Sequence, residues 1–238
     1  MSQSHKHLDI SAYFVVGPEN TCGRPVASII LAAIESGFTC IQIRSKIASA
    51  SEMIELTRQA AAVIEQKKKT NTVTLLVDDR LDVVLAARKQ GILVDGIHVG
   101  QSDIPVDVCR EYLGENAIIG LSARTDELLD YIQTADVSQI DYFGVGPLHE
   151  TATKPDCGLD SQGKVITRSL AELENLVRVS PLPIVVGGGV KLTDIPLLAQ
   201  TGVDGFFVVS AISEADDPKA SAKELVNSWK SNRGNQCK

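Results

Sequence analysis

The sequence is poor in aromatic residues and lacks the cysteine patterns that build disulfide or metal sites. Only 4% of its 238 residues are aromatic, and its five cysteines are scattered. They are odd in number and never spaced as C-x-x-C, which argues against a disulfide framework and against a zinc site. We therefore expect reduced thiols and a cytoplasmic location.

Long apolar runs and an excess of positive charge are also missing. No run approaches the roughly 20 apolar residues that a membrane-spanning helix needs, and the polar first residues predict no signal peptide. The formal net charge of −7 gives little support to nucleic acid or an anionic membrane as a partner. We expect small-molecule partners, and an anionic one would need a local cationic site. A homo-oligomer is left open.

Short runs rich in valine and isoleucine recur along the chain. Near-continuous apolar runs of this length are typical of parallel strands that are buried on both faces. The runs lie at residues 12–17, 38–45, 73–79, 95–100, 117–123, 141–147, 183–189 and 204–211. They predict eight strands.

Helix-start signals lie between these runs. Ser49 with Glu52, and Ser169 with Glu172, have the spacing of a capping box, in which the first side chain and the third residue cap each other. Thr193 is a candidate N-cap before another helix. Helices therefore alternate with the predicted strands.

Eight such alternations predict an α/β fold, a single (β/α)8 TIM barrel. We expect one domain over residues 1–238, with the barrel from about 12 to 230 and flexible tails at both ends. Residues 217–230 predict a last amphipathic helix. A doubly wound open sheet is the main alternative.

Polar residues and glycines gather where the predicted strands end. In a barrel, the carboxyl ends of all strands meet on one face, and catalytic residues lie there. Seven consecutive strands end in such residues, which are Gln42, Arg44 and Lys46; Asp78 and Asp79; His98 and Asp103; Ser122; Thr151, Thr153 and Lys154; Gly188 and Gly189; and Ser210. This pattern predicts an active site on that face.

An amide and two cations alternate at the end of the second strand. On a strand, Gln42, Arg44 and Lys46 would share one face. A planar guanidinium and an ammonium together suit a phosphate or a diphosphate. The alternative is that they close the barrel through ion pairs with Asp78 or Asp79, and the two interpretations are compatible.

Two carboxylates, Asp79 and Asp103, follow adjacent strands. Mg²⁺ prefers a few carboxylates together with substrate phosphate oxygens, so this pair suits that ion. Each aspartate could instead cap the helix that follows it.

The triple glycine at 187–189 predicts a second anion site. The loops after strands seven and eight of a barrel commonly bind phosphate through backbone N–H groups, and glycine permits close approach. A plain tight turn is the alternative, just as His98 could be a core histidine. No paired nucleophile and base stands out. Two anion sites on one face therefore predict transfer between two phosphorylated small molecules, with diphosphate as the leaving group.

Six motifs occur in an order that resembles one enzyme family. They are QxRxK at 42–46, GxHxGQxD at 96–103, GxS at 120–122, TxTK at 151–154, GG at 188–189 and VSAI at 209–212. Together they closely resemble thiamine-phosphate synthase over about residues 13–212. The resemblance implies an Mg²⁺-dependent transferase of thiamine biosynthesis. It would join 4-amino-5-hydroxymethyl-2-methylpyrimidine diphosphate to thiazole phosphate, giving thiamine phosphate and diphosphate.

The resemblance also implies roles for individual residues. The pyrimidine diphosphate would be held by Gln42, Arg44, Lys46, Ser122 and Lys154. Of these residues, Arg44, Lys46, Ser122 and Lys154 would be catalytic. Asp79 and Asp103 would bind the metal. The thiazole phosphate would contact Thr151, Thr153, Gly188, Gly189, Val209 and Ser210. Tyr13, Asp78 and His98 would lie near the pyrimidine diphosphate.

One departure from the family pattern stands at Asp78, where the family usually has asparagine. An ionised aspartate cannot donate a hydrogen bond, and beside a diphosphate it would need a cationic partner. Two alternative functions stay open. One is a thiazole tautomerase of the same fold, and the other is a non-catalytic relative that binds phosphorylated ligands.

Overall fold

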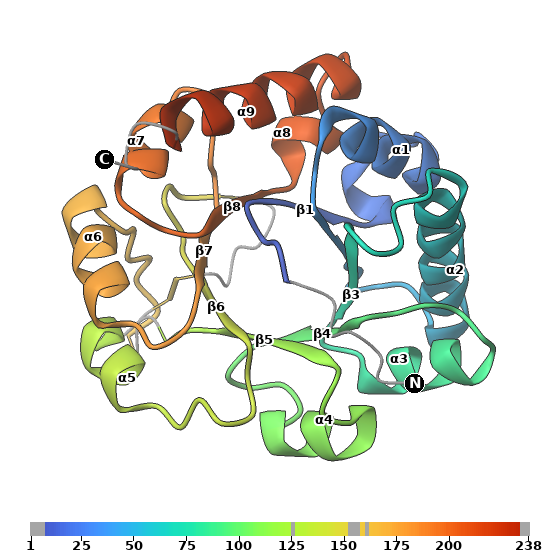
Figure 1. Cartoon of the computed structure of the whole chain (residues 1–238), viewed down its shortest axis with the longest axis horizontal. Coiled ribbons are helices and arrows are strands. Elements are labelled where there is room, and N and C mark those ends of the chain that lie inside the picture. Colours follow the sequence, from blue (N-terminus) through green and yellow to red (C-terminus); the bar gives the residue numbers. More distant parts are fainter. Residues whose placement is uncertain (1–7, 125–126, 152–157, 160–161, 234–238) are drawn as a thin grey trace.

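Eight parallel strands close into a barrel, as the sequence predicts (Figure 1). This computed structural model describes residues 8–124, 127–151, 158–159 and 162–233. The strands are β1 (Ala12–Val16), β2 (Cys40–Ile43), β3 (Thr74–Asp78), β4 (Gly96–Val99), β5 (Ile118–Ser122), β6 (Tyr142–Val145), β7 (Ile184–Val186) and β8 (Gly205–Val208). β1 pairs with both β2 and β8, which closes the ring and rules out the open sheet.

Each strand lies within its predicted run and ends before that run does. The last residues of each run leave the ladder to form the loops at one end of the barrel. β2 is an example: Gln42 lies in the strand, but Arg44 and Lys46 follow its end. The predicted alternation on one strand is therefore correct for Gln42 only.

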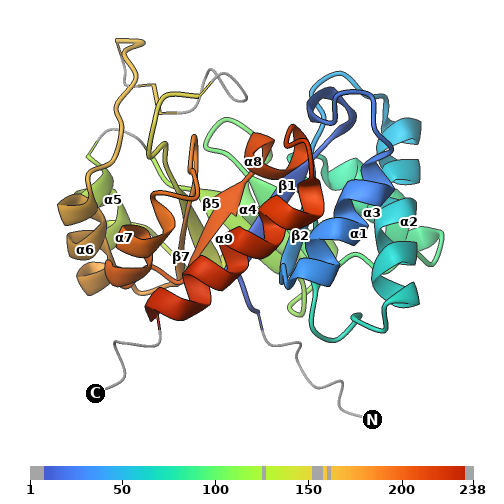
Figure 2. The same cartoon turned by 90° about the horizontal axis from the view of Figure 1, so that it is seen from above.

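Helices surround the barrel on the outside (Figures 1 and 2). They are α1 (Val26–Ser36), α2 (Ala50–Gln66), α3 (Leu81–Lys89), α4 (Val106–Leu113), α5 (Leu128–Thr134), α6 (Leu170–Val179), α7 (Ile195–Gln200), α8 (Ser210–Ser213) and α9 (Pro218–Arg233), with a short 3-10 helix η1 (Pro18–Asn20). In the described part of the chain, no helix has both the length and the apolar character to cross a membrane.

The capping boxes identify two helix starts correctly. Ser49 accepts a hydrogen bond from the Glu52 backbone N–H, and the Glu52 carboxylate accepts one from Ser49 in return. Ser169 likewise accepts from Glu172. The N-cap predicted at Thr193 is wrong because α7 begins one residue later. There the Asp194 carboxylate accepts from the Lys191 N–H and closes a turn before the helix.

The barrel interior is apolar at one end and polar at the other. Strand side chains, together with Ile10 just before β1, form a small buried cluster of Ile10, Tyr13, Val15, Cys40, Leu76, Ile118, Tyr142 and Val185. A larger cluster fills the layer between strands and helices. The hydroxyl groups of the two tyrosines mark the boundary, above which the interior opens to the strand-end loops.

Candidate active site

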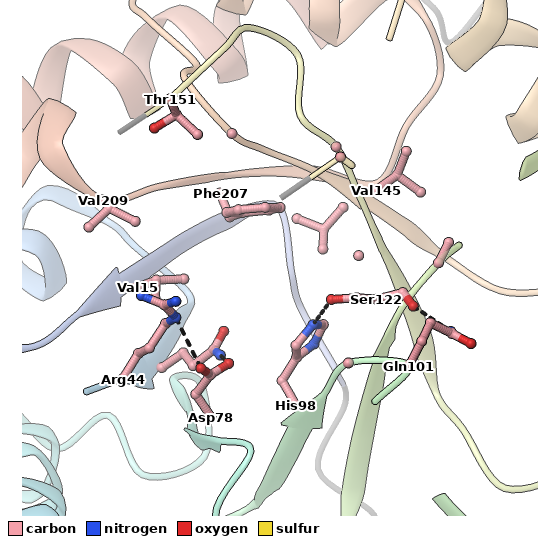
Figure 3. Close-up of a pocket in the computed structure, with 18 of the residues that line it drawn as sticks. Val15, Arg44, Asp78, His98, Gln101, Ser122, Val145, Thr151, Phe207 and Val209 are labelled. Atoms are coloured by element: carbon pink, nitrogen blue, oxygen red, sulfur yellow. Dashed lines mark hydrogen bonds and ion pairs between the residues drawn. The ribbon is translucent and has the colours of Figure 1, made fainter. Parts of the chain in front are cut away.

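A cavity of about 850 Å³ opens at the carboxyl ends of the strands. Most of the predicted site residues line it, namely Tyr13, Gln42, Arg44, Lys46, Asp78, His98, Asp103, Ser122, Thr151, Gly188, Gly189, Val209 and Ser210. Thr153 and Lys154 lie outside the described residues. Figure 3 shows Arg44 and Asp78 on one side of this cavity, Ser122 on the other, and Thr151 across from both.

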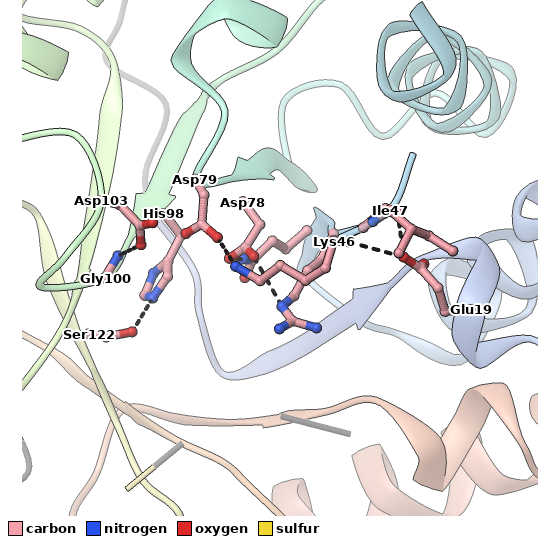
Figure 4. Close-up of polar contacts among 12 residues, drawn as sticks. Glu19, Lys46, Ile47, Asp78, Asp79, His98, Gly100, Asp103 and Ser122 are labelled. Atoms are coloured by element: carbon pink, nitrogen blue, oxygen red, sulfur yellow. Dashed lines mark hydrogen bonds and ion pairs between the residues drawn. The ribbon is translucent and has the colours of Figure 1, made fainter. Parts of the chain in front are cut away.

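Two ion pairs form the cationic side of the cavity. Arg44 Nε lies 3.0 Å from Asp78 Oδ2, and the Lys46 ammonium pairs with the Asp79 carboxylate (Figure 4). The Asp78 carboxylate also accepts from the Gln42 amide nitrogen. The ion-pair interpretation of this row is therefore correct. Asp78 is paired with Arg44, the cationic partner that an ionised aspartate at this position needs.

The charge states of this group follow from its surroundings. Burial opposes ionisation of Asp79, but hydrogen bonds from Lys46 and Asp103 outweigh it and hold the pKa of Asp79 below its usual value. Burial also opposes the charge of Lys46, yet Asp79 raises the pKa of that ammonium. We therefore expect Lys46 to stay cationic when Asp79 is ionised.

Asp79 and Asp103 bring two carboxyl groups together. They share a hydrogen bond, and burial together with Asp79 raises the pKa of Asp103. Neither residue caps a helix, because Arg80 and Pro105 occupy the N-cap positions of α3 and α4. Asp79 has a left-handed backbone with φ of +59°, and Asp103 accepts from the Gly100 N–H at 2.8 Å.

This pair fits Mg²⁺ better than a metal that needs a full set of protein ligands. Among the described residues, no group of three or more histidine, cysteine, aspartate or glutamate side chains is arranged to hold a metal ion. Two adjacent carboxylates leave most coordination positions to water and substrate oxygens, which is the usual state of Mg²⁺ in phosphoryl sites.

A hydrogen-bonded row of six side chains crosses the bottom of the cavity, and we call it the polar floor. Its distances are 2.6 Å from Tyr13 to Gln42, 2.9 Å from Tyr13 to Tyr142, 2.9 Å from Tyr142 to His98 and 3.0 Å from His98 to Ser122. In order, the members are Asp78, Gln42, Tyr13, Tyr142, His98 and Ser122, and each comes from a different strand. Apolar side chains of the buried cluster, Val15 and Val185, line the cavity beside the floor.

The polar floor has a direction, which the Asp78 carboxylate sets. A carboxylate only accepts, so Gln42 must turn its NH₂ group toward Asp78 and its carbonyl oxygen toward Tyr13. The Tyr13 hydroxyl hydrogen then goes to Gln42, and its oxygen must accept from Tyr142.

The same logic fixes the histidine. Because the Tyr142 hydrogen is directed to Tyr13, His98 Nδ1 must carry a hydrogen and donate to Tyr142. In the neutral ring, Nε2 then accepts from the Ser122 hydroxyl at 3.0 Å. Sequence analysis found no nucleophile–base pair, whereas the structure brings Ser122 and His98 together. The third group is a buried phenol and not a carboxylate, so the arrangement is not a hydrolytic triad.

The glycine turn after β7 forms the far side of the cavity. Gly188 and Gly189 have φ of +82° and +70°, a conformation that side-chain-bearing residues rarely adopt. A Cβ atom on Gly189 would lie 2.9 Å from His149 Cβ, so the backbone packs closely here. Thr151 and Ser210 line the cavity near this turn.

The sequence matches the family described as thiamine monophosphate synthase over residues 12–212. The chain belongs to this family. A thiamine-phosphate synthase from Corynebacterium efficiens is 38% identical over 93% of this chain and 95% of its own length. One from Vibrio campbellii is 37% identical over 83% of this chain and 88% of its own length.

A solved structure supports the same family assignment. Thiamine phosphate pyrophosphorylase from Pyrococcus furiosus superposes with a TM-score of 0.72 at 27% identity, covering 93% of this chain and 96% of that one. The tautomerase and the non-catalytic alternative are not favoured, because these relatives are named as synthases and the match spans nearly the whole chain.

Sequence reasoning missed two aromatic residues of this site, Tyr142 and Phe207. Both pack on a glycine of the neighbouring strand or its end: a Cβ atom on Gly120 would overlap the Tyr142 ring, and one on Gly187 would overlap Phe207. A glycine near a strand end, followed one strand later by an inward aromatic residue, is the signal that could have found them.

Removing the Tyr142 hydroxyl tests the polar floor as a unit. We expect Tyr142→Phe to lower the free energy of unfolding by about 1–3 kcal/mol, because Tyr13 and His98 each lose a buried partner. Urea unfolding measures this change. Tyr112→Phe is the control, because Tyr112 is 61% exposed. Equal stabilities of Tyr142→Phe and wild type would show that the floor does not act as a connected network.

Proposed function

We propose that this barrel joins 4-amino-5-hydroxymethyl-2-methylpyrimidine diphosphate to thiazole phosphate in the thiamine-phosphate synthase reaction. The bond between the pyrimidine methylene and the diphosphate oxygen breaks, and its electron pair leaves with diphosphate. The thiazole nitrogen then bonds the methylene carbon. The observation that carries the proposal is one cavity with Arg44 and Lys46 on one side and the Gly188–Gly189 turn on the other.

The cationic side stabilises the leaving group. Negative charge grows on the diphosphate as the bond breaks, so fixed positive groups stabilise the transition state more than the ground state. We assign this role to Arg44 and Lys46, with Ser122 at the opposite edge of the diphosphate. Lys154, outside the described residues, is the further cation that the family resemblance implies.

Asp79 and Asp103 would hold Mg²⁺ beside Lys46. The ion supplies positive charge to the diphosphate oxygens when it is bound. The two carboxylates would hold the ion, and their own contacts with Lys46 and Gly100 keep them in place. Asp78, in contrast, is assigned to Arg44 and to the polar floor.

The glycine turn would hold the phosphate of the thiazole. The phosphate would be surrounded by the backbone N–H groups of Gly188 and Gly189, the hydroxyls of Thr151, Thr153 and Ser210, and the backbone at Val209. Binding both substrates in one cavity places the thiazole nitrogen against the methylene carbon, which is the orientation effect of a two-substrate site. No general base is required. Tyr13, Gln42 and His98 would form the surface beneath the pyrimidine.

We propose a cytoplasmic location because the cysteines that the structure describes are present as thiols and not as disulfides. Among the described residues, Cys22 and Cys109 are free thiols. Free thiols of this kind are the rule in a reducing compartment.

Diphosphate release with both substrates tests the function and its metal dependence. We expect release only when both substrates and Mg²⁺ are present, near-complete loss of rate in excess EDTA, and recovery when Mg²⁺ is added back. Single-substrate reactions are the controls. Isomerisation of the thiazole without diphosphate release would indicate a tautomerase instead. Binding of both substrates without reaction would indicate the non-catalytic relative.

A further inference from the structure

One side-chain hydrogen bond joins the two loops that form the glycine-turn side of the cavity. His149, in the loop after β6, places Nε2 3.0 Å from Oδ2 of Asp194, which directly precedes α7. We infer that this pair, here called the loop clasp, positions the phosphate-binding turn for the thiazole phosphate. The inference rests on the proposed function. It makes His149 and Asp194 positioning residues, because neither lines the cavity.

The backbone of the β6 loop lies directly on the glycine turn. His149 N–H donates to the Gly188 carbonyl at 3.0 Å, and Leu148 N–H lies 3.0 Å from the carbonyls of both Gly187 and Gly188. A Cβ atom on Gly189 would lie only 2.9 Å from His149 Cβ, so the two segments are closely packed. The backbone hydrogen bonds thus couple the position of His149 to that of the turn.

The Asp194 carboxylate holds the other end of the same turn. Its Oδ2 atom accepts from the Lys191 N–H at 2.8 Å as well as from His149 Nε2. Since a carboxylate only accepts, His149 Nε2 carries the hydrogen of this bond. One oxygen atom thus contacts both the backbone of Lys191, two residues beyond Gly189, and the loop that leads to Thr151.

The clasp restrains the glycine turn, whose own backbone is flexible. Three consecutive glycines give the turn more backbone freedom than any other tripeptide would have. A phosphate bound by backbone N–H groups needs those groups fixed in direction before the ligand arrives. The His149 side chain is 47% exposed, so the pair itself adds little to the free energy of unfolding. Its effect should be seen in phosphate affinity and not in global stability.

His149→Ala tests the clasp by steady-state kinetics. We expect KM for thiazole phosphate to rise about fivefold to tenfold, about 1–1.4 kcal/mol in binding. KM for the pyrimidine diphosphate and the midpoint of thermal unfolding should stay at wild-type values. Asp194→Ala should behave alike, and the double variant should be no worse than either single one. His149→Gln should restore the wild-type KM, because an amide N–H can reach Asp194.

The thiazole alcohol, which lacks the phosphate, separates positioning from a general structural role. Its KM should be the same in His149→Ala and wild type, since the clasp acts on the phosphate alone. Lys67→Ala is the matched control, because it breaks a partly exposed side-chain pair between Lys67, which directly follows α2, and Glu35 of α1. An equal rise for alcohol and phosphate, or no rise for either, would overturn the inference.

Direct binding keeps this inference distinct from the proposed function. Calorimetric titration of thiazole phosphate should show the same fivefold to tenfold weakening in His149→Ala, whether or not product forms. If the wild type binds both substrates and releases no diphosphate, the proposed function fails and the clasp stands on the binding data. If the affinity is unchanged while the wild type turns over, only the clasp fails.

Discussion

Lys46→Ala is expected to retain no more than about 1% of the wild-type kcat. Lys46 is the ammonium that faces the cavity beside the proposed metal site, and its side chain is half exposed. Its loss removes a positive charge that stabilises the diphosphate while negative charge develops on it. Since an exposed lysine contributes little to folding, circular dichroism melting should be unchanged. Lys89→Ala, on the outer helix α3, is the charge-matched control.

Asp79→Ala belongs to the same experiment. It removes the partner of Lys46 and one proposed metal ligand together, so we expect a comparable loss of kcat and a higher Mg²⁺ concentration for half-maximal rate. The effects of the two substitutions should not add, because both act on one group of charges. A kcat within threefold of wild type for either variant would contradict the assignment of the cationic side.

Gly120→Ala is expected to lower the free energy of unfolding by about 3 kcal/mol and to abolish activity. Gly120 lies opposite Tyr142 in the β5–β6 register. A Cβ atom there would overlap the Tyr142 ring and lie 2.5 Å from His98 Nδ1. The variant therefore cannot keep the polar floor in its present geometry. Urea unfolding and the diphosphate assay measure the two effects.

Gly91→Ala separates this steric effect from backbone strain. Gly91 has φ of +77°, and a Cβ atom there would meet nothing within 4 Å. We expect a cost of about 1 kcal/mol from the left-handed conformation and full activity. If Gly120→Ala were no more destabilising than Gly91→Ala, the packing of Tyr142 on β5 would be looser than the structure indicates.

The barrel was predictable from sequence because its strands are buried on both faces. Burial of this kind leaves continuous apolar runs, and eight of them with helices between allow few arrangements. The end of each run also marks the face that carries function. That is why Gln42, Arg44, Asp78 and Ser122 can be grouped from the sequence alone.

The partners within the site could not be predicted in the same way. Tyr13 and Tyr142 are 129 residues apart, and they meet only because the ring closes with a particular register and side-chain direction. Whether Asp78 faces Arg44 or the metal pair also depends on rotamers that no periodicity specifies. The error at Thr193 is similar, since Asp194 takes part in a turn that local capping rules do not include.

The directed row beneath the cavity has an evolutionary consequence. An asparagine at position 78 could present either its oxygen or its nitrogen to Gln42, and would let the whole row run in either sense. A carboxylate at Asp78 removes that choice. The residue at position 78 on β3 therefore decides whether the Ser122 hydroxyl on β5 donates or accepts its hydrogen bond with His98. Because the family pattern keeps glutamine at position 42 with asparagine at position 78, relatives with that pair should allow the row to run in either sense.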